Sequence, residues 1–108
     1  MQVALKFDIE PELTPNPVGH VELEDGTTAT EAWAYPGPNK ISYNGAVATI
    51  DGTDYTAVCT NPAYEFGSWP AMTDVPDTPQ DFTVTFKKQS DVEFNFNVLE
   101  GFEEGIQI

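Results

Sequence analysis

Two turn signals, Asn44-Gly45 and Asp51-Gly52, lie close together in the stretch 41–58 and constrain the fold more than any other feature. Asn-Gly and Asp-Gly supply the positive φ angles that two-residue type I′ hairpin turns require. We therefore expect three consecutive antiparallel strands in this stretch. The predicted cross-strand partners are Tyr43 with Ala46, Ile41 with Ala48, Ile50 with Thr53 and Ala48 with Tyr55.

These pairings sort the side chains of the three strands onto two faces, because successive residues of a strand point to opposite sides. One face is apolar and collects Ile41, Tyr43, Ala46, Ala48, Ile50, Tyr55, Ala57 and Cys59. The other face holds Ser42, Val47, Thr49, Asp54, Thr56 and Val58, of which one is charged. The chain has a formal net charge of -14, yet no carboxylate lies between Glu31 and Asp51. We expect this neutral face to be covered, either by a second sheet of the same domain or by another subunit. Its small polar residues favour another subunit.

Period-two alternation also marks 3–9, 82–86 and 92–98, and no stretch has a helical period. The sequence therefore predicts one all-β domain over residues 1–108, an antiparallel β-sandwich or partly open barrel of about seven or eight short strands. Residues 87–91 are expected to form a hairpin loop. Residues 60–80 are expected to form a long loop rich in proline and aromatic residues, with at most a turn or two of helix.

Glu24-Asp25-Gly26 marks a further hairpin, between 18–23 and 27–35. A two-residue loop and a three-residue loop would place Trp33 on opposite faces relative to Val21 and Leu23. The sequence leaves this register open.

The charge balance excludes several classes of partner. The chain has 18 acidic residues against four lysines, and it has no arginine. Nucleic-acid backbones and anionic membranes attract clustered cations, so neither is an expected partner.

No apolar tract approaches the roughly 20 residues of a membrane helix, and the first residues lack the pattern of a signal peptide. We expect the protein in a virion or in a host cytoplasm, not secreted by a signal peptide.

Residues with catalytic or metal-binding chemistry are few. His20 is the single histidine and Cys59 the single cysteine, and no nucleophile motif, phosphate loop or zinc motif is present. Asp74, Asp77 and Asp81 lie in a proline-rich stretch without the spacing of a calcium loop, so they are expected to be turn residues, with calcium left open. The sequence predicts a protein that is not an enzyme and has no cofactor or metal.

Two further segments carry candidate partner contacts. Tyr64, Phe66 and Trp69 are expected to fold back on the sandwich, to anchor a partner, or to stack on a sugar. The terminal alternation of Ile106 and Ile108 would either close the sheet or pair with the edge of a neighbouring subunit. The predicted partner-binding residues are Ser42, Val47, Thr49, Thr56, Val58, Tyr64, Phe66, Trp69, Ile106 and Ile108.

These features predict a structural interaction protein that docks on a larger assembly, most simply a small viral (phage) accessory subunit such as a capsid decoration or cement protein. Its partner would be a protein, and we expect a homo-oligomer or edge-strand pairing. The alternative is an acidic phage-type inhibitor or nucleic-acid mimic that blocks a basic host-defence protein. Glu22 and Glu24, on one strand face, would be spaced like two phosphates of a DNA strand. A third hypothesis is an adhesin-like binding module.

Overall fold

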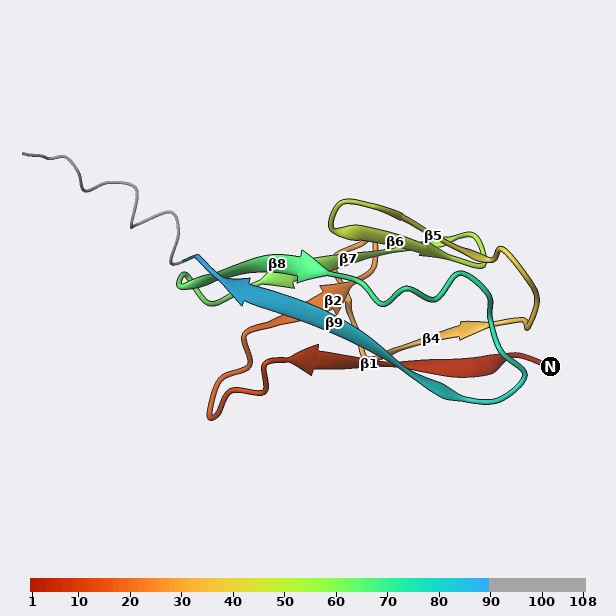
Figure 1. Cartoon of the computed structure of the whole chain (residues 1–108), viewed down its shortest axis with the longest axis horizontal. Helices are drawn as coiled ribbons and strands as arrows, with labels where there is room; N and C mark the ends of the chain where they lie inside the picture. The colour runs from red at the N-terminus through yellow and green to blue at the C-terminus, as the bar shows by residue number, and fades with distance from the viewer. Residues whose placement is uncertain (90–108) are drawn as a thin grey trace, which may run out of the picture.

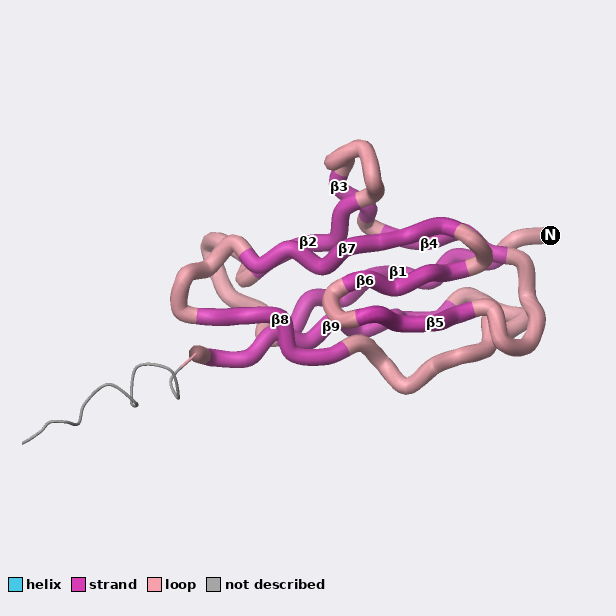
Figure 2. The backbone as a smooth tube through the Cα atoms, turned by 90° about the horizontal axis from the view of Figure 1, so that it is seen from above, coloured by secondary structure: helices cyan, strands magenta, loops and turns pink. Residues whose placement is uncertain are grey.

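The computed structural model describes residues 1–89 of the chain and shows an all-β fold of two sheets, which confirms the predicted fold class (Figures 1 and 2). Nine strands are present in these residues, somewhat more than expected. Sheet A has the order β4-β1-β9-β8 and sheet B the order β3-β2-β7-β6-β5. The strands are β1 (Val3–Glu10), β2 (Gly19–Glu22), β3 (Thr28–Ala29), β4 (Glu31–Ala34), β5 (Ile41–Asn44), β6 (Val47–Ile50), β7 (Thr53–Cys59), β8 (Tyr64–Ser68) and β9 (Gln80–Lys88).

The core lies between the two sheets and follows the alternation of each strand. Leu5 and Phe82 from sheet A, with Val21 and Ile50 from sheet B, are almost completely buried. They belong to one continuous cluster that contains residues of both sheets. Residues 1–89 contain no helix long and apolar enough to cross a membrane.

One strand pairing departs from the expected antiparallel arrangement. The first and last described strands, β1 and β9, are parallel, with Phe7 opposite Phe82 and Ile9 opposite Val84. The other strand pairs in both sheets are antiparallel. The parallel pair joins the two ends of the described chain at the centre of sheet A (Figure 1).

The turn between β6 and β7 has the predicted form. Asp51 and Gly52 have φ angles of 50° and 88°, as a type I′ turn requires. Ile50 pairs with Thr53 and Ala48 with Tyr55, so this register is confirmed.

The register predicted for the first hairpin is wrong by two residues. Tyr43 pairs with Ala48, not with Ala46, and Ile41 pairs with Ile50. The loop residues are Gly45 and Ala46, and of these only Gly45 has a positive φ, of 62°. Glycine at the first loop position is typical of a type II′ turn. Because the shift is two residues, each side chain stays on its predicted face.

The hairpin around Glu24-Asp25-Gly26 has a three-residue loop. The Leu23 N–H donates to the Thr27 carbonyl oxygen at 2.8 Å, and Gly26 has a φ of 88°. The expected strand over 27–35 is divided, because the chain leaves sheet B after Ala29 and enters sheet A at Glu31. Trp33 therefore lies in sheet A and not beside Val21.

Two other expectations about loops need correction. The segment 60–80 contains a strand, β8, which pairs with β9 through an irregular register between Phe66 and Ser68. Lys87 and Lys88 belong to β9 and pair with Glu65 and Tyr64, so they are not in a hairpin loop. Residues 90 and 91 of that loop and the strand predicted over 92–98 lie outside the described residues.

Candidate functional site

The neutral face, defined as Ser42, Val47, Thr49, Thr56 and Val58, lies on the outer side of sheet B. The residues that alternate with them, such as Ala48, Ile50 and Tyr55, are buried in the core against sheet A. Ser42 is exposed and the other four are half-buried. Within residues 1–89, sheet A therefore packs on the opposite side of sheet B, so the domain's own second sheet does not cover the neutral face. Its contact with another subunit stays a prediction.

Backbone pairing places the members of the neutral face in adjacent rows. Ser42 lies opposite Thr49 across β5 and β6, and Val47 lies opposite Thr56 across β6 and β7. Side chains directly opposite one another in antiparallel strands are within contact distance. The five residues therefore form a continuous surface across three strands.

The charged groups around the neutral face are engaged by nearby side chains. Thr49 Oγ1 donates to Asp54 Oδ1 at 2.7 Å, so the one carboxylate that β5, β6 and β7 place on this side has a partner. On the β2 side, Glu22 lies opposite Thr56 and His20 opposite Val58. The Nε2 of His20 and the Oε2 of Glu22 are 2.7 Å apart. This polar border could not be predicted from the sequence, because the register of the 18–35 hairpin was open.

The aromatic residues of the 60–80 segment fold back on the core, as the first of their three interpretations predicts. Tyr64, Phe66 and Trp69 are half-buried and pack against the core cluster. The Trp69 ring is 6.1 Å from that of Tyr43, and its Nε1 donates to the Gly45 carbonyl oxygen at 3.0 Å. Their contact with a partner stays a prediction. The predicted contacts of Ile106 and Ile108 lie outside the described residues.

Several aspartates hold turns and loops in place. Asp51 accepts from the Tyr35 N–H at 2.9 Å and from Lys40 Nζ at 3.1 Å. These two hydrogen bonds, the one from Tyr35 first, lower the pKa of Asp51 below its usual value. Asp74 accepts from the Asn39 N–H at 2.9 Å. This is the turn and loop role expected from the sequence. In the part of the chain that the structure describes, no three His, Cys, Asp or Glu side chains are grouped so as to hold a metal ion.

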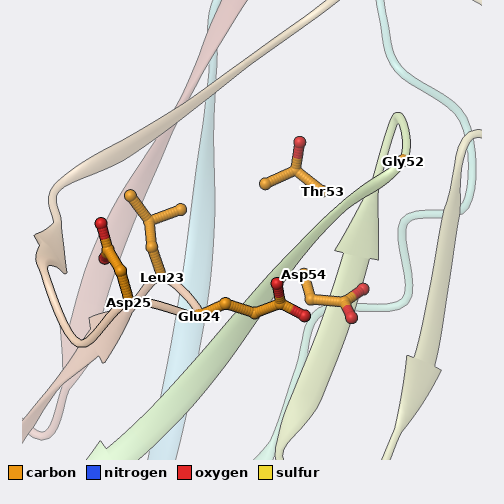
Figure 3. A pocket seen from close by; sticks show the side chains of 6 residues that line it. All are labelled: Leu23, Glu24, Asp25, Gly52, Thr53 and Asp54. Atoms are coloured by element: carbon orange, nitrogen blue, oxygen red, sulfur yellow. The ribbon is translucent and has the colours of Figure 1, made fainter.

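A shallow hollow of about 420 Å³ lies between the β2–β3 loop and the start of β7 (Figure 3). Glu24 extends across it toward Asp54, but the Asp54 carboxylate points away from Glu24 and accepts from Thr49 on β6. Asp25 points away from the hollow. Hydrogen bonds from Thr27 lower the pKa of Asp25. The lining residues supply three carboxylates and one hydroxyl group. They are Leu23, Glu24, Asp25, Gly52, Thr53 and Asp54.

Glu24 lies in this loop and not on β2, so it does not share a strand face with Glu22. The predicted spacing of these two carboxylates along one strand is therefore wrong. The reason is that the strand ends at Glu22 and the three-residue loop begins after Leu23.

Sequence reasoning also missed two exposed aromatic residues, Trp33 and Tyr35. Each has 54% of its surface exposed. The alternation of Ala32 and Ala34 with Trp33 could have indicated them, because small residues on the core side of a strand leave the large ones outside.

No family model, curated protein or solved structure matches the chain.

Proposed function

We propose that this protein is a non-enzymatic docking subunit that binds a larger protein assembly through the neutral face of sheet B. The observation that carries the proposal concerns the neutral face. Its residues are nearly all uncharged, and they lie on the outer side of sheet B, outside the core. A strand surface in a chain of net charge -14 that holds Val47 and Val58 but few acids favours contact with protein over contact with water.

The assembly we propose is a virion, in which the protein would be a decoration or cement subunit. A small, acidic β-sandwich is suited to this role, since repulsion between acidic exteriors keeps particles apart. The aromatic residues that are packed in the core support a rigid scaffold for the face.

The alternative, an acidic mimic that blocks a basic protein, receives less support. A mimic needs carboxylates aligned along one surface and free to meet cations. Asp51, Asp54 and Asp74 instead accept hydrogen bonds from the domain's own donors. Glu22 is close to His20.

Photo-crosslinking tests the proposal by position. Ser42 is exposed on the neutral face and Thr85 is exposed on the outer side of sheet A. A photoreactive amino acid is placed at one or the other, and each variant is activated in extracts of the source cells before and after particle assembly. We expect a discrete crosslinked product from position 42, in a constant ratio of product to assembled particle. We expect no product from position 85. Equal products from both positions, or none from either, would overturn the proposal.

A further inference from the structure

Strand β4 presents an unusual edge to solvent. Apart from Met1, the exposed large apolar residues of 1–89 are Trp33 on this strand and Tyr35 directly after it. Trp33 lies opposite Ala4 of β1, whose small side chain does not cover the indole. The Trp33 Nε1 donates to Glu31 Oε2 at 3.0 Å, which holds the ring beside a carboxylate.

The backbone of this edge is available for pairing. Within residues 1–89, β4 is the terminal strand of sheet A, with β1 on one side only. The Phe7 N–H donates to the Thr30 carbonyl oxygen at 3.1 Å, and this residue pair follows the β1–β4 register. In antiparallel strands, hydrogen-bonded residue pairs alternate with pairs that are not hydrogen-bonded. The backbone N–H and C=O groups of Thr30, Ala32 and Ala34 therefore point toward β1. The N–H and C=O groups of Glu31 and Trp33 therefore point away from the sheet.

Tyr35, two residues after Trp33, has no partner in the β1–β4 register. Its N–H donates instead to Asp51 Oδ2 at 2.9 Å. No backbone bond from a turn or loop of residues 1–89 reaches Glu31 or Trp33. An unpaired edge of this kind can accept an additional strand.

The charged residues beside the β4 edge favour a positively charged added strand. Across the outer side of sheet A, Glu31 lies opposite Lys6, and Lys6 lies opposite Asp81. Asp8 lies two residues further along β1 on the same face. Among these residues carboxylates therefore outnumber the one lysine, Lys6, next to an exposed indole ring. A cationic side chain can stack on the indole and lie near the carboxylate of Glu31.

We propose that β4 is a docking edge at which an extended, basic segment of a partner protein adds as a further strand of sheet A. Its backbone pairs with Glu31 and Trp33, and an arginine or lysine side chain stacks on Trp33. A second copy of this chain fits the edge poorly, since both copies carry a net charge of -14. This edge is distinct from the neutral face, so the proposal does not depend on the proposed function.

A synthetic nine-residue peptide tests the proposal, with arginine alternating with valine or threonine and both ends blocked. Titration calorimetry gives its affinity, and amide chemical shifts locate the contact. We expect binding that shifts the Glu31 and Trp33 amides. The same peptide N-methylated at alternate backbone nitrogens keeps the charge and cannot pair as a strand, so we expect it not to bind.

Three variants separate strand addition from general attraction between opposite charges. We expect Trp33→Ala to weaken binding about fivefold or more. Glu31→Lys is expected to weaken it more than about tenfold, since it reverses the charge beside the ring. The matched control Glu10→Lys makes the same charge change at an exposed position further along β1 and should weaken binding less than about threefold.

Each opposite result overturns the proposal. These results are no binding of the arginine peptide at about 1 mM, equal binding of the N-methylated peptide, or equal losses in Glu31→Lys and Glu10→Lys. Dimerisation of the wild type that Trp33→Ala disperses would assign the edge to a second copy instead. A positive charge introduced on the neutral face by Val47→Lys should leave peptide binding unchanged, which separates this test from that of the proposed function.

Discussion

Replacing Phe82 with alanine tests whether the core joins the two sheets through one aromatic cluster. Phe82 on β9 has 0% of its surface exposed. Its ring centroid is 5.7 Å from that of Phe7, 6.4 Å from that of Tyr43 and 6.0 Å from that of Trp69. Tyr43 belongs to sheet B, so the ring connects both sheets. Truncating a buried phenylalanine costs about 3–5 kcal/mol, which is a large share of the about 5–15 kcal/mol that stabilises a domain.

Thermal and urea unfolding measure this loss, with Trp69 fluorescence as a probe beside the site. Since about 1 kcal/mol shifts the Tm of a domain of this size by about 4–8 °C, we expect the Tm to fall by about 12 °C or more. The control Thr85→Ala lies on the same strand but is exposed, and it should cost less than about 1 kcal/mol. A Phe82→Ala variant as stable as this control would refute the packing of the two sheets through Phe82.

Three further predictions concern the turns, the pH dependence and the net charge. Gly45→Val and Gly52→Val should each destabilise the domain by more than about 1 kcal/mol in urea unfolding, because a side chain is strained at φ angles of 62° and 88°. This strain comes from the backbone alone, since no atom lies within 4 Å of the added Cβ. If both variants were as stable as the wild type, the assigned turns would be contradicted. Burial raises the pKa of Tyr43 from 10.0 to about 12, so its contribution to stability is complete below pH 10 and is lost as the pH rises to about 12. Tyr43→Phe should remove that part of the alkaline loss in unfolding measurements, and an unchanged pH profile would contradict it. Added NaCl should raise the Tm at neutral pH by screening the net charge of -14, and a fall in Tm would show that self-repulsion does not oppose folding.

The faces of the 41–58 strands could be predicted from sequence although one register could not. Glycine marks both turns, but it takes the second loop position in a type I′ turn and the first in a type II′ turn. The sequence Asn44-Gly45 is compatible with either choice, and the two choices differ by two residues in register. A period of two is unchanged by such a shift, so the neutral face was placed correctly.

The features that were missed depend on contacts between distant parts of the chain. The parallel pairing of β1 with β9 joins segments about as far apart as the described chain allows, and no local pattern encodes it. The change of sheet at Thr30 likewise follows from packing, and it decides where Trp33 lies. The short strand β8 was hidden because prolines flank it at Pro62 and Pro70.

The most direct test of the proposed docking face is the stability and crosslinking of the double variant Val47→Lys with Val58→Lys. Both side chains lie on the outer side of sheet B, so each change should cost no more than about 1 kcal/mol and the variant should unfold cooperatively. The control residue Ala48 directly follows Val47 on β6 but has 0% of its surface exposed, so Ala48→Lys should unfold the domain because a buried unpaired charge costs several kcal/mol. We predict that the folded double variant gives no crosslinked product from position 42. A double variant that unfolds like Ala48→Lys, or one that stays folded and crosslinks like the wild type, would contradict the neutral face as the docking surface.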